Sequence, residues 1–252
     1  MIEIRNVGKS YGKKEVLRNV SIALPERRIS AFIGANGAGK STLLSLVSRL
    51  LPRSGGDIAI DGRRLEDWDS RELAKNLAVL RQSNFMNIRL TVGELVSFGR
   101  FPYSQGRLTD EDEAMVERAL AHMDIAPLRH RFLDELSGGQ RQMAFIAMVI
   151  AQDTRYVLLD EPLNNLDIKH SVHMMRVLRG LVDDLGKTVV IVIHDINFVS
   201  CYADYIVALR DGELVAAGDR VGIMTPEVLG GIYGIDIDIR EIDGNRICIY
   251  YQ

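Results

Sequence analysis

The stretch ISAFIGANGAGKST, residues 29–42, decides the fold that this sequence predicts. Its first five residues form an almost wholly apolar run, which is typical of a strand buried on both faces of a parallel sheet. Gly34–Thr42 then fits the pattern G-x-x-x-x-G-K-[ST], and the apolar segment that begins near Ser41 predicts a helix. A strand, a glycine-rich loop and a helix in this order predict a phosphate-binding loop.

The residue types in this loop suit a bound nucleotide. Glycines let the backbone wrap round phosphate oxygens, so that N–H groups and the helix N-terminus point at negative charge. Lys40 can reach the β- and γ-phosphates, while the hydroxyl of Ser41 can ligate Mg²⁺. We therefore expect the following residues of the loop to bind the nucleotide: Gly34, Asn36, Gly37, Ala38, Gly39, Lys40, Ser41 and Thr42.

Two further apolar runs end in polar residues. Tyr156–Leu159 is followed by Asp160 and Glu161, and Thr188–Ile193 is followed by His194. Ligands of open α/β sheets gather beyond the carboxyl ends of the strands, so these signals and the glycine-rich loop converge on one edge. We expect Asp160 to hold Mg²⁺ through water and Glu161 to polarise the attacking water as general base. These elements indicate a P-loop NTPase and leave GTPases, kinases and helicase-like motors open.

Composition limits the classes of partner. The formal net charge is −3, so no global cationic field favours a nucleic-acid backbone, and we expect no nucleic-acid partner.

Cys201 and Cys248 lie far apart in sequence and are interpreted as reduced thiols. His170 and His173 have helical spacing but are interpreted as surface residues rather than metal ligands. The longest apolar runs fall short of the about 20 residues that span a bilayer, so any membrane-spanning partner is expected to be another chain.

The rest of the chain shows three patterns. Residues 85–151 predict a mainly helical region, in which Thr109 is an expected N-cap and Asp110–Glu113 complement the helix dipole. The tail Ile237–Tyr251 predicts strands with a turn at Asp243–Gly244. Short segments punctuated by Gly, Asn and Pro predict an antiparallel N-terminal subdomain with strands at Ile2–Val7, Val16–Leu24 and Ile58–Asp61.

Residues 136–140, LSGGQ, precede a helical run that is expected to begin near Gln142. This pentapeptide matches the signature of the ABC ATPase family in full, and the chain resembles that family over residues 1–225. A serine hydroxyl, glycine N–H groups and a helix N-terminus make a second anion cradle. The resemblance implies a head-to-tail dimer with ATP and Mg²⁺ between two copies. Four residues of the signature would then meet the γ-phosphate held by Lys40 of the second copy: Ser137, Gly138, Gly139 and Gln140.

Other positions resemble the family's functional residues in chain order. Tyr11 resembles the aromatic residue that stacks on adenine, and Gln82 resembles the glutamine that senses Mg²⁺ and the γ-phosphate. Residues 164–167, NNLD, resemble the loop that crosses the dimer interface, which makes Asp167 a candidate nucleotide-site residue. His194 resembles the switch histidine that contacts the γ-phosphate. The resemblance therefore assigns catalytic roles to Glu161, His194 and Gln82, and metal binding to Ser41, Gln82 and Asp160.

The resemblance also implies the fold class, which is the α/β P-loop ABC-ATPase fold. It predicts a mostly parallel core sheet, an N-terminal antiparallel β-subdomain and an inserted helical subdomain. We expect one ABC ATPase domain over residues 1–252. Residues 1–83 and 153–225 would form the core with the β-subdomain, 84–152 the helical signature subdomain, and 226–252 a strand-rich C-terminal tail.

Three stretches resemble the ATPases of bacterial ferric-siderophore importers, a family that also serves haem and vitamin B12. They are GRFPYSQGR at 99–107, LSGGQRQMAFIAMVIAQD at 136–153 and LDEPLNNLDIKHSVHMM at 159–175. The resemblance implies import of ferric siderophores, with the catecholate type first. The alternatives are an importer subunit for haem, B12 or another metal chelate, and a soluble ABC ATPase such as an iron–sulfur assembly scaffold.

Such an importer implies three partners: a second copy of the chain, an integral membrane permease and, indirectly, a periplasmic or lipoprotein substrate-binding protein. The expected location is the cytoplasmic face of the bacterial cell membrane. The groove around Gln82–Tyr103 is the expected docking site for a helix of the permease. Five apolar residues in this stretch could fill either the groove or the core: Phe85, Met86, Leu90, Phe98 and Phe101.

Overall fold

The computed structural model describes residues 1–82 and 88–251. The chain forms two compact units, one from Met1–Trp68 with Thr188–Gln252 and the other from Asp69–Lys187. The second unit is wider than the predicted helical subdomain 84–152, because it also holds two strands and the helices next to them. The boundaries of these two units differ from those of the predicted subdomains. The predicted subdomains remain a prediction.

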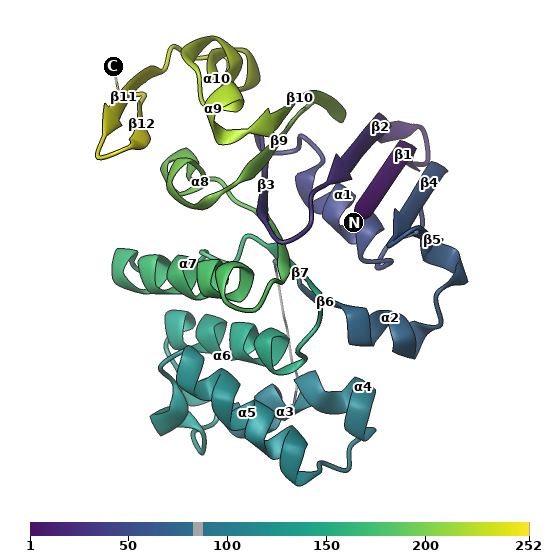
Figure 1. Ribbon diagram of the computed structural model, residues 1–252, viewed down its shortest axis with the longest axis vertical. Coiled ribbons are helices and arrows are strands. Elements are labelled where there is room, and N and C mark those ends of the chain that lie inside the picture. The colour runs from purple at the N-terminus through teal and green to yellow at the C-terminus, as the bar shows by residue number, and fades with distance from the viewer. Residues whose placement is uncertain (83–87, 252) are drawn as a thin grey trace. The chain divides into compact units, whose positions relative to one another are not determined.

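An antiparallel sheet lies at the N-terminus of the first unit (Figure 1). Its order is β2-β1-β4-β5, with β1 at Ile2–Tyr11, β2 at Lys14–Leu24, β4 at Gly55–Ile60 and β5 at Arg63–Arg64. Ile2 pairs with Leu24 on one side and with Ile60 on the other. Side chains alternate along a strand, so Ile2 and Ile4 both point into the core and are almost fully buried. The predicted antiparallel subdomain is confirmed.

The first unit also holds the strands that carry the glycine-rich loop. Their order is β10-β9-β3-β8, with β3 at Ile29–Ile33, β8 at Thr188–Val192, β9 at Tyr205–Arg210 and β10 at Glu213–Asp219. Strand β3 pairs in parallel with β8 and with β9. Every residue of β3 and β8 is buried. The continuous apolar runs at 29–33 and 188–192 therefore form the doubly covered parallel strands that they predict.

Helices and a hairpin complete the first unit. The helices are α1 at Lys40–Val47, α8 at Ile196–Tyr202, α9 at Arg220–Ile223 and α10 at Pro226–Tyr233, with a 3₁₀ turn at Leu65–Asp67. The predicted strands in the tail are present, because β11 at Asp238–Ile242 pairs with β12 at Asn245–Ile249. Asp243 and Gly244 both have positive φ angles and form the turn between these strands.

The prediction that the whole stretch 226–252 is strand-rich was wrong for its first part, which is the helix α10. The hydroxyl of Thr225 accepts the N–H of Val228 and caps this helix, and Pro226 stands in its first turn. Gly234 then adopts a left-handed conformation and ends the helix. The tail is therefore a short helix followed by a hairpin.

The second unit contains two parallel strands and six α-helices in its described part. The strands are β6 at Leu77–Leu80 and β7 at Tyr156–Asp160. The helices are α2 at Ser70–Asn76, α3 at Val92–Ser97, α4 at Phe101–Ser104, α5 at Asp110–His122, α6 at Gly138–Ala151 and α7 at Ile168–Asp183. Three 3₁₀ turns lie at Phe98–Arg100, Ala126–Leu128 and Leu133–Glu135. Helix α6 packs against α3 and α5, and buries Met143 and Phe145 (Figure 1).

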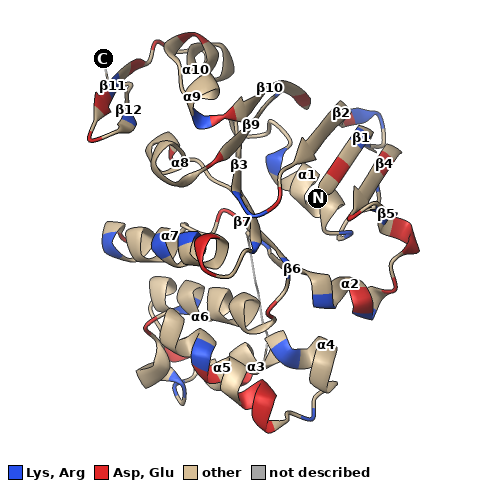
Figure 2. Cartoon of the chain, in the orientation of Figure 1, with Lys and Arg blue, Asp and Glu red and all other residues tan. Residues whose placement is uncertain are grey.

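The start of α5 agrees with the predicted cap. The hydroxyl of Thr109 accepts the N–H of Asp112, and the carboxylate of Asp112 accepts the N–H of Thr109. Figure 2 shows the acidic first turn of this helix in red. Asp112 is also buried in an ion pair with Arg100 at 2.8 Å, so this acidic residue joins α5 to the turn before α4. None of the helices in residues 1–82 and 88–251 combines the length and apolar character that crossing a membrane requires.

Candidate functional site

The glycine-rich loop lies between β3 and α1, and its backbone requires glycine. Gly34, Gly37 and Gly39 have φ angles of 137°, 82° and 100°, which belong to the left-handed region that side chains disfavour. A Cβ atom on Gly34 would lie only 2.0 Å from the carbonyl oxygen of Leu209. The loop therefore follows a path that other residues could not take without displacing the neighbouring backbone.

Lys40 begins α1, and its side chain turns back over the loop. It is only 4% exposed, and its Nζ donates to the carbonyl oxygens of Gly34 at 2.7 Å and Ala35 at 2.9 Å. Gly39, the residue at the N-cap of α1, makes no side-chain cap, since glycine has no side chain to offer. A buried ammonium group at a helix N-terminus is an attractive environment for an anion.

The loop has room for a phosphate group. Within the described ranges, no other atom lies within 4 Å of a Cβ position built on Gly37, and Asn36 and Gly37 are exposed. Ser41 and Thr42 are half-buried in the first turn of α1. Backbone N–H groups, one ammonium group and two hydroxyls are the groups that bind a nucleotide phosphate and its Mg²⁺. The residues of this loop therefore fit both the phosphate and the metal ion.

Two more predicted residues belong to the first unit. Tyr11 ends β1, and its ring is 50% exposed, as a stacking surface for adenine has to be. Nζ of Lys9 lies 4.8 Å from the centre of this ring and donates to the carbonyl oxygen of Pro52. Lys9 was not predicted from the sequence, although residues two apart on a strand share a face. His194 is exposed and follows β8, at the carboxyl end of that strand.

In the second unit, Glu161 is the centre of a polar cluster. It directly follows Asp160, the last residue of β7, which is 6% exposed. Oε2 of Glu161 accepts hydrogen bonds from Nε2 of Gln82 and from Nδ2 of Asn164, both at 2.7 Å. Its φ angle of 49° is unusual for a residue with a side chain and is a feature of strained functional positions. Two neutral donors therefore fix the orientation of this carboxylate.

The signature residues form the start of α6. Ser137 is the N-cap, because its hydroxyl accepts the N–H of Gln140 at 3.2 Å, while the side chain of Gln140 accepts the N–H of Ser137 at 3.1 Å. The helix starts at Gly138, four residues before the position expected near Gln142, because this capping box fixes its N-terminus. Gly138 and Gly139 are thus the first helical residues, with their N–H groups in the first turn.

The loop at 164–167 lies against the signature residues. A Cβ atom on Gly139 would lie 3.3 Å from the carbonyl oxygen of Asn165. Asp167 is the N-cap of α7 and accepts the backbone N–H of His170 at 2.8 Å. That hydrogen bond holds the pKa of Asp167 below its usual value, so the carboxylate stays ionised. The second unit therefore brings together two elements that the sequence assigns to the nucleotide site.

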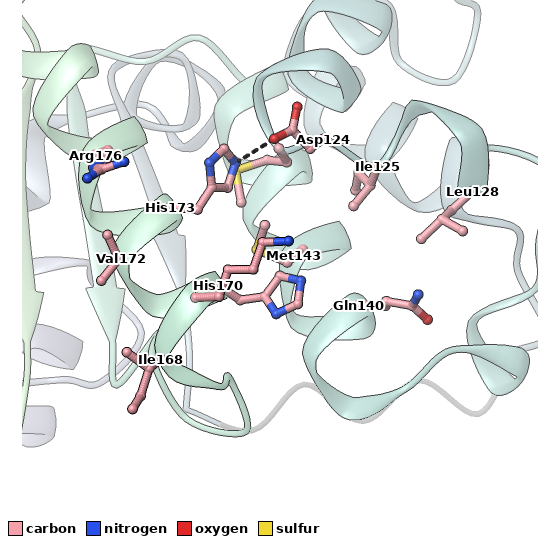
Figure 3. Close-up of a pocket in the computed structure, with 12 residues that line it drawn as sticks. Asp124, Ile125, Leu128, Gln140, Met143, Ile168, His170, Val172, His173 and Arg176 are labelled. Atoms are coloured by element: carbon pink, nitrogen blue, oxygen red, sulfur yellow. Dashed lines mark ion pairs between the residues drawn. The ribbon is translucent and has the colours of Figure 1, made fainter.

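A cavity of about 580 Å³ lies beside the signature residues and is lined by parts of α6 and α7 (Figure 3). His170 and His173, which were expected on the surface, are half-buried and point toward this cavity, where Gln140 also lies. Nδ1 of His170 lies 2.8 Å from Asp167, and Nε2 of His173 lies 3.6 Å from Asp124. Among the described residues, no group of three or more His, Cys, Asp and Glu side chains is placed to hold a metal ion.

The predicted site residues are divided between the two units. The first unit holds Tyr11, the phosphate loop from Gly34 to Thr42, and His194. The second unit holds the remaining predicted residues: Gln82, Ser137, Gly138, Gly139, Gln140, Asp160, Glu161 and Asp167. Within the second unit the structure joins Gln82 to Glu161 and the signature residues to the loop at 164–167, although these segments are far apart in the sequence.

Three of the five apolar residues of the expected docking stretch lie in a groove. Phe98 and Phe101 are 45% and 57% exposed and line a groove of about 660 Å³, together with the half-buried Leu90. They are therefore not core residues. Phe85 and Met86 lie outside the described residues.

Known proteins are similar to this chain over most or all of its length. A family profile described as ABC transporter matches residues 17–164. The chain is 56% identical over 252 residues to the petrobactin import ATP-binding protein YclP of Bacillus subtilis (strain 168), and the match covers all of both chains. It is 46% identical over 250 residues to the petrobactin import ATP-binding protein FatE of Bacillus anthracis, covering 99% of this chain and 100% of that protein.

A solved structure is similar over most of its length. It is the dimeric structure of MJ0796, described as a bacterial ABC transporter cassette. The TM-score is 0.79 and the sequence identity is 31%, over 87% of this chain and 99% of that chain.

Proposed function

The chain belongs to the ABC transporter family, and we propose that it powers an importer of ferric siderophores. The observation that carries the proposal is the identity of 56% over the full length to a petrobactin import ATP-binding protein. The relative with 46% identity is also a petrobactin import ATP-binding protein. The alternatives are an importer of haem, B12 or another metal chelate, and a soluble ABC ATPase. Purification of the membrane partner and a growth assay test these alternatives.

As an ABC ATPase, the chain hydrolyses ATP. In the binding step that we propose, Tyr11 stacks on adenine and the N–H groups of residues 36–42 surround the phosphates. Lys40 exchanges its contacts with the carbonyl oxygens of Gly34 and Ala35 for phosphate oxygens. Ser41, Gln82 and Asp160 are the residues that would hold Mg²⁺, which when bound offsets negative charge on the phosphates. The buried position of Lys40 supports this step, because little solvent has to be displaced from its ammonium group.

Glu161 is the general base of the proposed hydrolysis. Its carboxylate accepts hydrogen bonds from Gln82 and Asn164, and an ionised carboxylate can accept a proton from water. Because Nε2 of Gln82 donates to this carboxylate, a change in the position of Gln82 would also change the orientation of the base. This hydrogen bond supports a role for Gln82 in positioning Glu161.

Two copies of the chain complete each site in the proposed mechanism. The N–H groups at the start of α6, around Ser137 and Gly139, would approach the γ-phosphate held by Lys40 of the second copy. His194 would contact the same phosphate and hold the catalytic geometry. The dimeric structure of MJ0796, at 31% identity, supports this arrangement. Closure of the dimer would act on the permease, and hydrolysis would reset it.

The groove with Phe98 and Phe101 is the proposed docking site for the permease. Exposed aromatic residues are costly for a free surface and suit a protein interface. We therefore place the chain at the cytoplasmic face of the membrane, with a substrate-binding protein on the other side of the permease.

The first experiment identifies the partner. The tagged chain is purified from detergent-solubilised native membranes, in parallel with a variant that carries Phe98→Glu and Phe101→Glu. We expect a stoichiometric polytopic membrane protein with the native chain, and its loss with the variant, while the ATPase activity of the isolated variant persists. Soluble assembly proteins in place of a membrane protein would overturn the importer proposal and favour the soluble alternative.

The second experiment identifies the cargo. A strain without the chain is complemented with the native sequence or with Glu161→Gln, and growth is measured with iron supplied as ferric petrobactin, as haem or as free salt. We expect growth on ferric petrobactin only with the native sequence. Growth that depends on the chain with haem but not with ferric petrobactin would replace the siderophore proposal.

A further inference from the structure

The helix that follows His194 is too short to be stable by itself. Helix α8 has seven residues, Ile196–Tyr202, and begins two residues after His194. Isolated helices shorter than about 12–15 residues are marginal in water. The conformation of α8 therefore depends on its contacts, and a change in its tilt would move His194.

The first turn of α8 is fixed from within. The carboxylate of Asp195 accepts the N–H groups of Asn197 at 2.8 Å and Phe198 at 3.2 Å. Ile196 and Val199 are buried and attach one face of the helix to its unit. Another face is in contact with the C-terminal hairpin β11–β12.

The side chain of Asn197 forms two hydrogen bonds with this hairpin. Its Oδ1 accepts the N–H of Cys248 at 2.8 Å, and its Nδ2 donates to the carbonyl oxygen of Cys248 at 3.3 Å. One amide side chain thus satisfies both backbone groups of a residue that is 51 positions away and 2% exposed. A second contact lies one turn later, where the hydroxyl of Ser200 donates to the carbonyl oxygen of Arg246.

The hairpin is itself held from a second direction. Nη1 of Arg246 donates to the carbonyl oxygens of Val221 at 2.6 Å and Met224 at 3.0 Å, which belong to the segment around α9. Two-stranded hairpins are marginally stable alone, so β11–β12 depends on these anchors. Four of the five residues of β11 are exposed, so the contacts with α8 come from β12. The hairpin therefore connects α8 to the segment around α9, which also contacts α8 directly because Nη1 of Arg220 donates to the carbonyl oxygen of Ser200.

We propose that Asn197 is a positioning residue for His194, and that it acts by anchoring α8 to the C-terminal hairpin. By binding Cys248 through both backbone groups, Asn197 anchors the first turn of α8, which Asp195 caps, to the hairpin and so holds the backbone that presents His194 to the nucleotide. This inference rests on the proposed role of His194 as the residue that contacts the γ-phosphate. It assigns a catalytic purpose to the tail, beyond the residues 1–225 that the family resemblance covers.

The test is a double-mutant cycle on the full-length chain with Mg²⁺–ATP. The variants are Asn197→Ala, His194→Ala and the double substitution, and kcat, KM and nucleotide affinity are measured for each. We expect Asn197→Ala to lower kcat by roughly threefold to thirtyfold, with nucleotide affinity and KM within about twofold of the native chain. In the His194→Ala background the same substitution should change kcat by less than about twofold, because the positioned group is gone.

Two control variants separate positioning from a loss of folded protein. Asn197→Asp keeps the acceptor for the N–H of Cys248 but loses the donor to its carbonyl oxygen, so its kcat should lie between those of the native chain and Asn197→Ala. Asn245→Ala removes an amide of the same hairpin whose hydrogen bond runs to the carbonyl oxygen of Asp243, within the hairpin itself, so it should leave kcat unchanged. Thermal unfolding of every variant reports the folded fraction.

The outcomes distinguish two failures. If His194→Ala leaves kcat unchanged, the proposed role of His194 is wrong, and the inference falls with it. If His194→Ala lowers kcat but Asn197→Ala does not, or if the two effects multiply in the double variant, the positioning role alone is overturned. A fall in kcat that Asn245→Ala reproduces, or that follows the folded fraction, would likewise reduce Asn197 to a structural residue.

Discussion

The two glycine-containing loops proposed to bind phosphate use glycine for different reasons. In the loop at 34–42, Gly34, Gly37 and Gly39 have positive φ angles, so the backbone itself demands glycine. In the signature, Gly138 and Gly139 are ordinary helical residues at the start of α6. What restricts Gly139 is its neighbour, since a Cβ atom there would lie 3.3 Å from the carbonyl oxygen of Asn165.

The polar side chains of the two loops also differ. The ammonium group of Lys40 is buried among carbonyl oxygens of its own loop, beside space for a phosphate. In the signature, Ser137 and Gln140 satisfy each other's backbone N–H groups in a capping box. The first loop therefore offers a charge and a backbone path with open space at Gly37, whereas the second offers the start of a helix. This difference is what the proposed division of roles requires, with the first loop binding nucleotide within one chain and the second contacting the nucleotide of another copy.

The largest expected effect separates binding from hydrolysis. Glu161→Gln should lower the rate of phosphate release by roughly 10²- to 10⁴-fold, because the general base is lost. The affinity for ATP should stay within about twofold, because the first loop is intact, and an ATP-dependent dimer should accumulate. Phosphate release, a calorimetric titration and light scattering measure the three quantities.

Glu94→Gln is the matched control for the isolated chain, since Glu94 also accepts two hydrogen bonds but belongs to the cap of α3. Its turnover should equal that of the native chain. Near-normal turnover of Glu161→Gln would remove Glu161 from the role of base.

The second prediction compares the glycines directly. Gly34→Ala should lower the free energy of unfolding by roughly 2–6 kcal/mol and abolish nucleotide binding, because overpacking and backbone strain add. Gly138→Ala should leave that free energy unchanged or raise it by up to about 1 kcal/mol, because alanine favours helix. The nearest atom to its Cβ is the Cβ of Asn165 at 3.5 Å, an ordinary contact.

Denaturant unfolding with a nucleotide titration measures both variants. Turnover of Gly138→Ala should still fall, because the added methyl group lies at the N–H groups offered to the second nucleotide. Equal losses of stability in the two variants would erase the distinction between the loops.

The third prediction concerns the charge in the first loop. Lys40→Ala should weaken ATP binding by roughly ten- to hundredfold, the value of a hydrogen bond to a charged group. Lys187→Ala is the matched control, because its Nζ also contacts a backbone carbonyl, that of Thr154, at 2.8 Å. Calorimetric titration of both variants with ATP measures the difference. Unchanged affinity in Lys40→Ala would contradict the assignment of the loop.

The sequence predicted the strands and turns that depend on the local pattern of residues. The apolar runs at 29–33 and 188–192 became buried parallel strands, because such runs can only be covered on both faces. The start of α6 was placed four residues late, although the capping-box pattern of Ser137 and Gln140 was present in the sequence. The helix α10 was missed in the same way, since Thr225 and Pro226 are start signals.

Contacts between distant segments were beyond local pattern. The hydrogen bond from Gln82 to Glu161 joins residues 79 positions apart, and the clamp of Asn197 on Cys248 joins residues 51 apart. Each depends on how separate elements pack, which residue spacing does not encode. The family resemblance supplied the roles of the site residues, and the structure added the hydrogen bonds that orient Glu161.

The smallest expected effect distinguishes the two properties of Ser137. Ser137→Ala removes the cap of α6 and should lower the free energy of unfolding by about 0.5–2 kcal/mol. Ser137→Asp keeps a capping acceptor and adds a charge that favours the helix N-terminus, so its stability should match the native chain. That same charge would repel the phosphate of the second nucleotide, so turnover should fall further in Ser137→Asp than in Ser137→Ala.

Thermal unfolding and steady-state phosphate release give the two rankings. If the signature is a phosphate cradle, the order of stability and the order of turnover are opposite for these variants. If Ser137 were only a helix cap, both orders would be the same, and the more stable aspartate variant would also be the more active one.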